Sequence, residues 1–187
     1  EDRYRQNVQP NSFLEVANHW DNYNLSVLMQ PRVNAFYEGI QRSPDIQFTG
    51  TRHQLGDPPL YYDTESSVGY FQRRYDYASA SEDYGLLRAD TLHQVYLPKT
   101  IGGWLNVTPR VGMRFTHYGE SNGVGSTKPS SERYVAHTGV EVSTKFSKMM
   151  PELNSRLLGI DTGARHIIQP SINFAYIPRP NRVPDEL

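Results

Sequence analysis

Apolar and polar residues alternate along most of this chain, and this period of two restricts the fold more than any other feature. Successive side chains of a β-strand point to opposite faces of a sheet, so a long alternation predicts a strand with one apolar and one polar face. The clearest stretch is residues 102–118, where Leu105, Val107, Val111 and Met113 alternate with polar residues such as Arg110. The pattern predicts an all-β protein.

Eight stretches alternate in this way, whereas helical periodicity is confined to residues 149–158, which contain Pro151. The expected strands are residues 12–20, 23–33, 44–53, 60–70, 86–97, 102–118, 133–146 and 168–176. Several of them exceed the roughly 5–6 residues that are usual in soluble sheets. We therefore predict an antiparallel up-and-down meander of about eight strands, with neighbours paired in sequence order.

The links between these strands alternate in length. Residues 21–22, 56–59 and 98–102 make short links, whereas residues 34–42, 78–85 and 119–131 make long ones. In an up-and-down barrel, links of one parity lie at one end, and outer-membrane barrels keep one end short and the other long. Residues 159–163 depart from this rule, because they make a long link where a short one is expected.

The apolar residues of the later strands are expected to share one convex face: Leu105, Val107, Val111, Met113, Val140, Val142, Ile172 and Phe174. No apolar run approaches the roughly 18 residues of a spanning helix, but a spanning strand needs only about ten alternating residues. A soluble β-sandwich shows the same alternation with the apolar face turned inward, so the pattern does not decide between them. Strand length, and tyrosine and phenylalanine near the strand ends, favour the membrane barrel.

Residues that carry catalytic or metal chemistry are scarce. The chain has no cysteine, and its formal net charge of −1 argues against a nucleic-acid surface. The six histidines lack ligand spacing, although His117 and His137 lie on neighbouring expected strands. The glycine-rich residues 119–128 lack the Gly-Lys-Ser/Thr ending of a phosphate-binding loop, and no G-x-S-x-G motif is present. We expect no catalytic residue, no metal and no cofactor.

Fifteen of the 19 basic residues are arginine, the side chain whose planar fork pairs with carboxylates and phosphates. Many of these arginines lie on the polar face. The candidate set for a polar, lumen-facing wall is Arg88, Arg110, Arg114, Arg133, Glu141 and Asn173. One interpretation is structural, with the arginines paired across strands to Asp63, Glu65, Asp90 and Glu141. The other is contact with a phosphorylated lipid that passes the interior.

Three groups of motifs, in order over residues 4–178, resemble those of the lipopolysaccharide-assembly outer-membrane protein family LptD, also called organic solvent tolerance protein. Residues 41–48 (QRSPDIQF), 55–62 (LGDPPLYY) and 69–71 (GYF) resemble its R-L-P-E-L … P-L-Y-F … G-Y-F run. Arg88-x-Asp90, Leu97-Pro98 and residues 103–118 resemble its R-x-D … L-P … L-T-P-x-x-G-x-R-x-T-x-Y stretch. Residues 165–178 (RHIIQPSINFAYIP) are similar to its R-H-x-I-x-P-x-x-x-Y-x-Y-x-P strand.

This resemblance implies a very large barrel in the outer membrane of a Gram-negative bacterium. Such a barrel forms a two-part translocon with a plugging lipoprotein. It receives lipopolysaccharide from a periplasmic jellyroll bridge and inserts it into the outer leaflet. Residues 1–187 are then expected to be one segment of the barrel domain, without the amino-terminal jellyroll and the seam strands. Pro109 and Pro170 match motif positions with a barrel-shaping role, and the family's structural cysteines are absent from this stretch.

Two other functions remain open at this point. A self-contained eight-stranded outer-membrane barrel, serving as porin, anchor or enzyme, would pair its first and last strands. A soluble β-sandwich binding module would pack its apolar residues into one dry core between two sheets.

Overall fold

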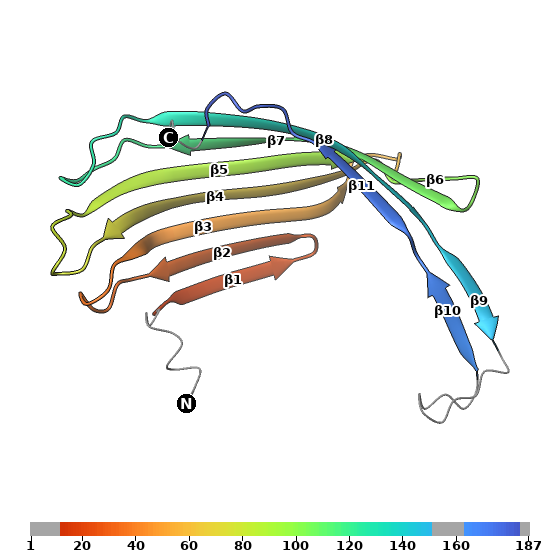
Figure 1. Cartoon of the computed structure of the whole chain (residues 1–187), viewed down its shortest axis with the longest axis horizontal. Coiled ribbons are helices and arrows are strands. Elements are labelled where there is room, and N and C mark those ends of the chain that lie inside the picture. Colours follow the sequence, from red (N-terminus) through yellow and green to blue (C-terminus); the bar gives the residue numbers. More distant parts are fainter. Residues whose placement is uncertain (1–11, 151–162, 184–187) are drawn as a thin grey trace.

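A computed structural model describes residues 12–150 and 163–183 of the chain, and most of these residues lie in β-strands (Figure 1). The strands are β1 (Leu14–Trp20), β2 (Tyr23–Gln30), β3 (Gly39–Gln54), β4 (Tyr61–Arg74), β5 (Tyr84–Tyr96), β6 (Lys99–Ile101), β7 (Leu105–Tyr118), β8 (Ser131–Thr144), β9 (Phe146–Met150), β10 (Ala164–Ile168) and β11 (Ser171–Tyr176).

All pairings are antiparallel, and the main sheet follows the order β1-β2-β3-β4-β5-β7-β8-β11, with β6 also paired to β7. The small β9–β10 sheet continues β8 and β11 rather than forming a separate layer, because the register of β8–β11 extends unchanged into β9–β10. In the same way β6 prolongs β5 after Leu97-Pro98. The eleven strands therefore correspond to eight strands, three of which are each interrupted once: β5 with β6, β8 with β9, and β10 with β11. The predicted meander of about eight strands is confirmed.

The alternation of link lengths is also confirmed for the links that the structure describes, whereas residues 159–162 of the predicted exception lie outside the described residues. Residues 31–38, 75–83 and 119–130 form the long links, which lie together at the left end of the sheet in Figure 1. The first two links contact each other, because Phe36 and Tyr77 make an edge-to-face pair with ring centroids 5.9 Å apart. Asn122 of the third link forms a bridge with Gly85 of β5. The short links are residues 21–22, 55–60 and 102–104, at the opposite end of the strands.

Several predicted boundaries were wrong. β3 begins at Gly39 rather than at residue 44, because a register shift between Arg42 and Asp45 accommodates Pro44 inside the strand. β7 begins at Leu105, because Gly102 and Gly103 have φ angles of +61° and +78° and make the turn from β6. Of residues 149–158, where alone the sequence shows helical periodicity, Met149 and Met150 belong to β9, and residues 151–158 lie outside the described part of the chain.

The most unusual property of this sheet is its inverted burial. Among the described residues no apolar side chain is buried, whereas Ser26, Asp45, Thr64, Asp90 and Thr116 are. This excludes the dry core of a β-sandwich. The self-contained barrel is also wrong for the described residues, because β1 and β11 form two open edges of the sheet instead of pairing with each other. A sheet with this burial needs an apolar environment outside it.

Candidate functional site on the polar face of the sheet

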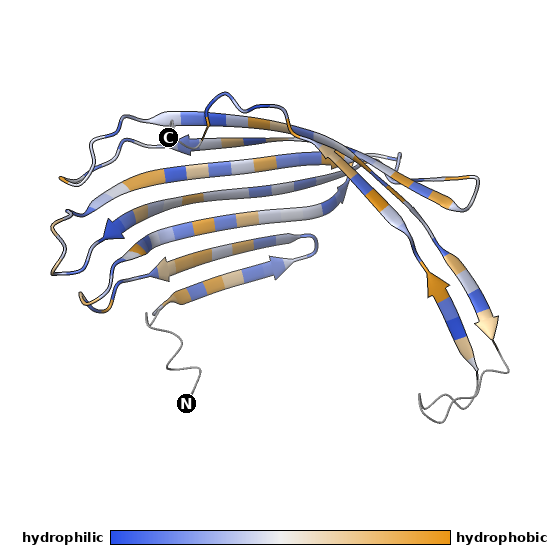
Figure 2. Ribbon diagram, viewed as in Figure 1, coloured by the Kyte–Doolittle hydropathy of each residue, from blue (hydrophilic) through white to orange (hydrophobic). Residues whose placement is uncertain are grey.

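Cross-strand register assigns every side chain of the later strands to one of two faces. Val107 lies opposite Val142, which lies opposite Ile172, and Val140 lies opposite both Pro109 and Phe174. Hydropathy alternates along the strands (Figure 2). Together with this alternation, the register places the eight predicted apolar residues on one face, here called the apolar face. Val111, Phe174 and Ile172 are 59%, 60% and 74% exposed there.

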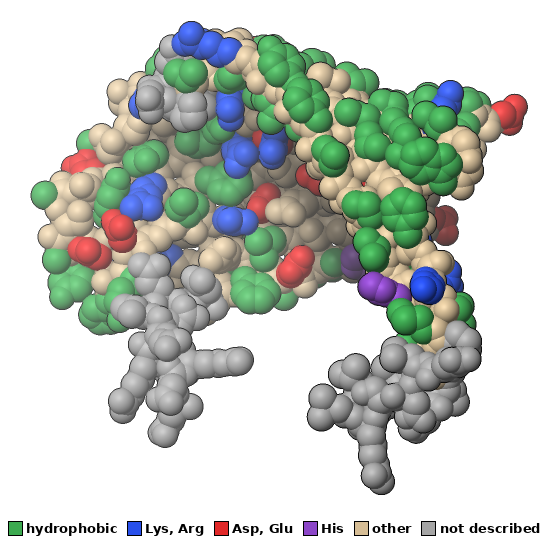
Figure 3. Space-filling view, turned by 45° about the vertical axis from the view of Figure 1, so that its right-hand side comes forward, with side chains coloured by type: hydrophobic (Ala, Val, Ile, Leu, Met, Phe, Trp, Pro, Cys, Tyr) green, Lys and Arg blue, Asp and Glu red, His purple; other side chains and the backbone are tan. Residues whose placement is uncertain are grey.

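The six candidate residues all lie on the other face, here called the polar face. Arg88 lies opposite Tyr118, four residues along β7 from Arg114, and Thr116 lies opposite Arg133. Glu141 lies opposite Asn173 at the far side of the sheet. Figure 3 shows Lys, Arg, Asp and Glu side chains gathered in the hollow of the curved sheet. The sheet therefore presents one hydrated, charged wall and one apolar wall.

The centre of the polar face is the Asp90 carboxylate, of which only a small part is exposed. Arg114 Nε donates to both of its oxygens, at 2.8 and 3.1 Å. The Thr116 hydroxyl donates at 2.7 Å, and Arg88 donates at 3.2 Å. Two half-exposed guanidinium groups thus share one buried carboxylate, which leaves the cluster with one net positive charge.

A second cluster of the same kind lies nearer the long links. Asp45 accepts hydrogen bonds from Arg42 and Gln47, each at 3.2 Å, and the Arg42 guanidinium lies 5.7 Å from the centre of the Phe71 ring. The two clusters border one hollow of about 270 Å³. Sequence analysis missed this second cluster, because the register shift at Pro44 changes the face that Arg42 occupies relative to strict alternation.

The remaining candidates are spread over the polar face. Arg110 donates to the Asn173 side chain at 2.7 Å, whereas Nε of Arg133 has no hydrogen-bond partner in the described structure. The expected pairing of arginines with Asp63, Glu65 and Glu141 is wrong for the residues described, where only Asp90 of that group forms ion pairs. Asp63 instead accepts the backbone N–H of Arg52 at 2.7 Å.

The two predicted shaping prolines lie where a neighbouring strand is interrupted. The Pro109 carbonyl accepts a hydrogen bond from the Leu97 N–H at 3.1 Å. The proline nitrogen, which carries no hydrogen, is therefore also on the side of the Leu97-Pro98 interruption between β5 and β6. Pro170 accepts the Thr144 N–H at 3.2 Å, next to the interruption between β8 and β9. No bulge marks Pro109, which lies inside β7 with its register intact. Both prolines remove a donor where the ladder is already broken.

The histidines do not form a metal site in the described residues. His117 and His137 do not approach each other as the sequence suggested, because His117 lies on the apolar face and His137 on the polar face, opposite Gly112. His93 lies on the apolar face but is hydrogen-bonded to Tyr62, Thr64 and Thr91, and Thr91 is bonded to Ser66. The polar side chains on the apolar face thus satisfy one another.

The structure combines an antiparallel meander, an exposed apolar face without a core and a charged concave face. This combination defines a class of protein, because it is the structure expected of part of the wall of an outer-membrane barrel. The family model described as "LptD: LPS transport system D" matches residues 18–186. The chain therefore belongs to the LptD family, an outer-membrane family involved in lipopolysaccharide transport. No curated protein matches the chain. The described residues include no helix long and apolar enough to cross a membrane.

Proposed function

We propose that this chain forms part of the wall of an outer-membrane translocon that inserts lipopolysaccharide into the outer leaflet of a Gram-negative bacterium. The observation that carries the proposal is the separation of an exposed apolar face from a charged concave face, with no apolar core among the described residues. The apolar face contacts the acyl chains of membrane lipid. The polar face, which includes Arg88, Arg110, Arg114, Arg133, Glu141 and Asn173, lines the path of the lipid's sugar and phosphate groups.

This function requires no bond chemistry, so the chain acts as a conduit rather than an enzyme. Residues 1–187 contribute one segment of the barrel domain. Its partners are a plugging lipoprotein and a periplasmic jellyroll bridge that delivers the lipid. It does not bind nucleic acid. Pro109 and Pro170 shape the wall by letting it bend where neighbouring strands are interrupted.

Photo-crosslinking in cells tests the proposal. Crosslinkers placed at Arg110, Arg114 or Asn173 in the full-length protein are expected to capture lipopolysaccharide more often than crosslinkers at Val111 or Ile172. Arg110 neighbours Val111 in β7 and Asn173 neighbours Ile172 in β11, so the two sets lie at similar positions along the same strands. Equal capture on both faces, or none on the polar face, would overturn the assignment of the lipid path.

A further inference from the structure

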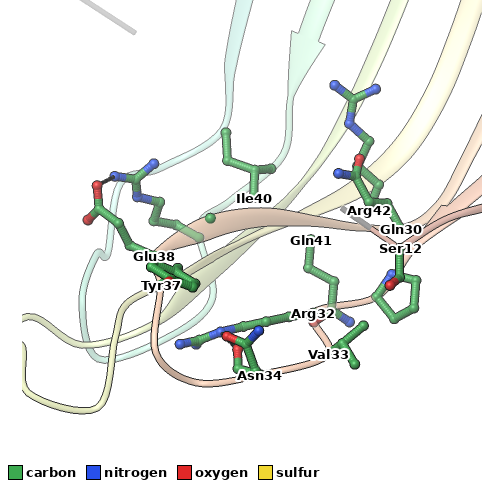
Figure 4. Close-up of a pocket in the computed structure, with 13 residues that line it drawn as sticks. Ser12, Gln30, Arg32, Val33, Asn34, Tyr37, Glu38, Ile40, Gln41 and Arg42 are labelled. Atoms are coloured by element: carbon green, nitrogen blue, oxygen red, sulfur yellow. Dashed lines mark hydrogen bonds and ion pairs between the residues drawn. The ribbon is translucent and has the colours of Figure 1, made fainter. Parts of the chain in front are cut away.

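A hollow of about 350 Å³ lies beneath the first long link and was not singled out by the sequence. It is bordered by the end of β2, by residues 31–38 and by the beginning of β3 (Figure 4). Arg73 of β4 also belongs to the lining. Three arginines, Arg32, Arg42 and Arg73, line it against one carboxylate, Glu38. The Asp45 carboxylate, just outside the lining, pairs with Arg42, so the arginines exceed their carboxylate partners here by one positive charge.

The three guanidinium groups are held in different ways. Arg73 pairs with Glu38 at 3.1 Å and lies 5.4 Å from the centre of the Tyr75 ring. Arg42 is fixed by Asp45 and Phe71. Arg32 donates from Nε to the Asn34 carbonyl at 2.6 Å, and its buried Nη2 has no hydrogen-bond partner in the described structure.

This arrangement favours an anion. Like charges that line one hollow repel each other unless a counter-ion enters, and a phosphate offers acceptors that match guanidinium donors. Glu38 is half exposed on the link, so an entering anion can replace it as the partner of Arg73. Asp45 is almost fully buried and keeps Arg42 in place. The hollow has room for a phosphate together with the sugar that carries it.

We propose that this hollow binds a phosphate group borne on the sugars of a glycolipid. The proposal rests on the proposed function, since it names the chemical group that the polar face recognises, and places that contact at the end of the strands where the long links lie. The ligand chemistry is a phosphate monoester or diester, and free phosphate offers the same oxygens, so the two sources need separate measurements.

The test is a titration of the purified full-length protein with lipopolysaccharide, before and after phosphatase treatment of the lipid. R32Q and R73Q are each expected to weaken binding of the untreated lipid about tenfold, the loss of one charge-assisted contact. E38Q is expected to strengthen it, because Arg73 is released. R52Q, at the opposite end of β3 and outside the lining, serves as the matched control and is expected to bind as the unmodified protein does.

Phosphatase-treated lipid is expected to bind the unmodified protein as weakly as untreated lipid binds R73Q. Inorganic phosphate alone is the second probe. If it binds with the affinity of the intact lipid, the glycolipid assignment is overturned, and if R32Q, R73Q and R52Q all bind alike, the site itself is overturned. Retained crosslinking at Asn173 alongside unchanged binding in R73Q refutes this inference alone, whereas loss of all polar-face crosslinking refutes the proposed function.

Discussion

At the scale of single residues, buried charge is what distinguishes this chain from an ordinary sheet. Asp90 and Asp45 are the buried carboxylates of the polar face, 7% and 3% exposed, and each is satisfied by arginine and by a neutral donor. A buried charge is tolerated only when it is paired and hydrogen-bonded. The arginines they hold are partly exposed, so the same residues anchor the wall and offer donors to the hollow.

Removing the Asp90 carboxylate is expected to destabilise the folded protein. D90A deletes the acceptor of Arg88, Arg114 and Thr116 and should cost about 1.5–3 kcal/mol of unfolding free energy, the range for hydrogen bonds to charged groups. E65A, on the same face but without an ion pair among the described residues, is the control and should change stability by less than about 0.5 kcal/mol. Urea unfolding in liposomes measures both, and equal effects would contradict the role given to Asp90.

The link between β4 and β5 carries a pH-dependent contact. Hydrogen bonds from the Arg74 guanidinium and from the Tyr75 amide hold the pKa of the Asp83 carboxyl below its ordinary value of 3.8. Because the folded-state pKa is depressed, the contact contributes stability above that value and loses it as the pH falls below it.

Hydrogen exchange at the Tyr75 amide, corrected for intrinsic rates, is therefore expected to accelerate as the pH drops below about 3.8. D83A should remove both the protection and its pH dependence. D57A, in the short link between β3 and β4, should leave the profile of Tyr75 unchanged. A profile in D83A identical to that of the unmodified protein would refute this assignment.

At the scale of elements, the strands act as two-faced walls whose register fixes what each residue faces. Arg110 and Val111 are neighbours in β7, yet one bonds to Asn173 and the other is exposed on the apolar face. A register shift of one residue would turn every charged side chain of the strand to the apolar face and every apolar side chain to the polar face. Both sets of residues therefore favour the same register. The effect of a substitution in a strand is therefore expected to depend more on the face that the side chain occupies than on its position along the strand.

Arginine on the apolar face should be costly. V111R and V140R are each expected to lose about 2–4 kcal/mol of stability in a bilayer if they lie near its midplane. T108R, whose side chain lies on the polar face opposite Glu141, is the matched control and should cost less than about 1 kcal/mol. Folding into liposomes, followed by the shift in electrophoretic mobility on heating, reports the difference. Similar losses on both faces would argue against lipid contact.

The prolines of the strands can be tested by moving them. P109A should change stability by less than about 1 kcal/mol, because the restored N–H faces the interruption between β5 and β6. M113P places a proline four residues along, where the ladder to His93 of β5 is continuous, and should cost at least about 2 kcal/mol. The same liposome assay applies. If P109A destabilises the protein as much as M113P does, Pro109 shapes the strand through the fixed φ angle of its ring and not through its missing N–H donor.

At the scale of the whole molecule, the sheet is open and single-layered. Its edges at β1 and β11 expose backbone N–H and C=O groups that have no partner strand among the described residues. Unpaired backbone groups are too costly in hydrocarbon for such an edge to face lipid. A sheet of this kind is stable in a membrane only as part of a larger closed structure.

Amide exchange in the full-length protein tests this requirement. The outward amides of β1 and β11 are expected to be protected to about the same degree as those of β5, which has neighbours on both sides. The Val124 amide, in the exposed third long link, provides the unprotected reference. Fast exchange along β1 or β11 would mean that the edge is not paired.

The sequence by itself determined the strands, the alternation of link lengths and the face of most residues within a strand. These features are local, because backbone geometry alone sends successive side chains to opposite sides. It also located Arg88, Arg110, Arg114, Arg133, Glu141 and Asn173 on the polar side of their strands.

Only the tertiary structure decided which charges meet. Asp90 and not Glu65 receives the arginines, because the pairing of β5 with β7 brings Arg114 and Thr116 beside Asp90 from 24 and 26 residues away. The face of Arg42, the interruptions beside Pro109 and Pro170 and the basic hollow under residues 31–38 likewise depend on how strands and links meet. Contacts between strands depend on long-range register, which period-two alternation leaves free to shift by any even number of residues.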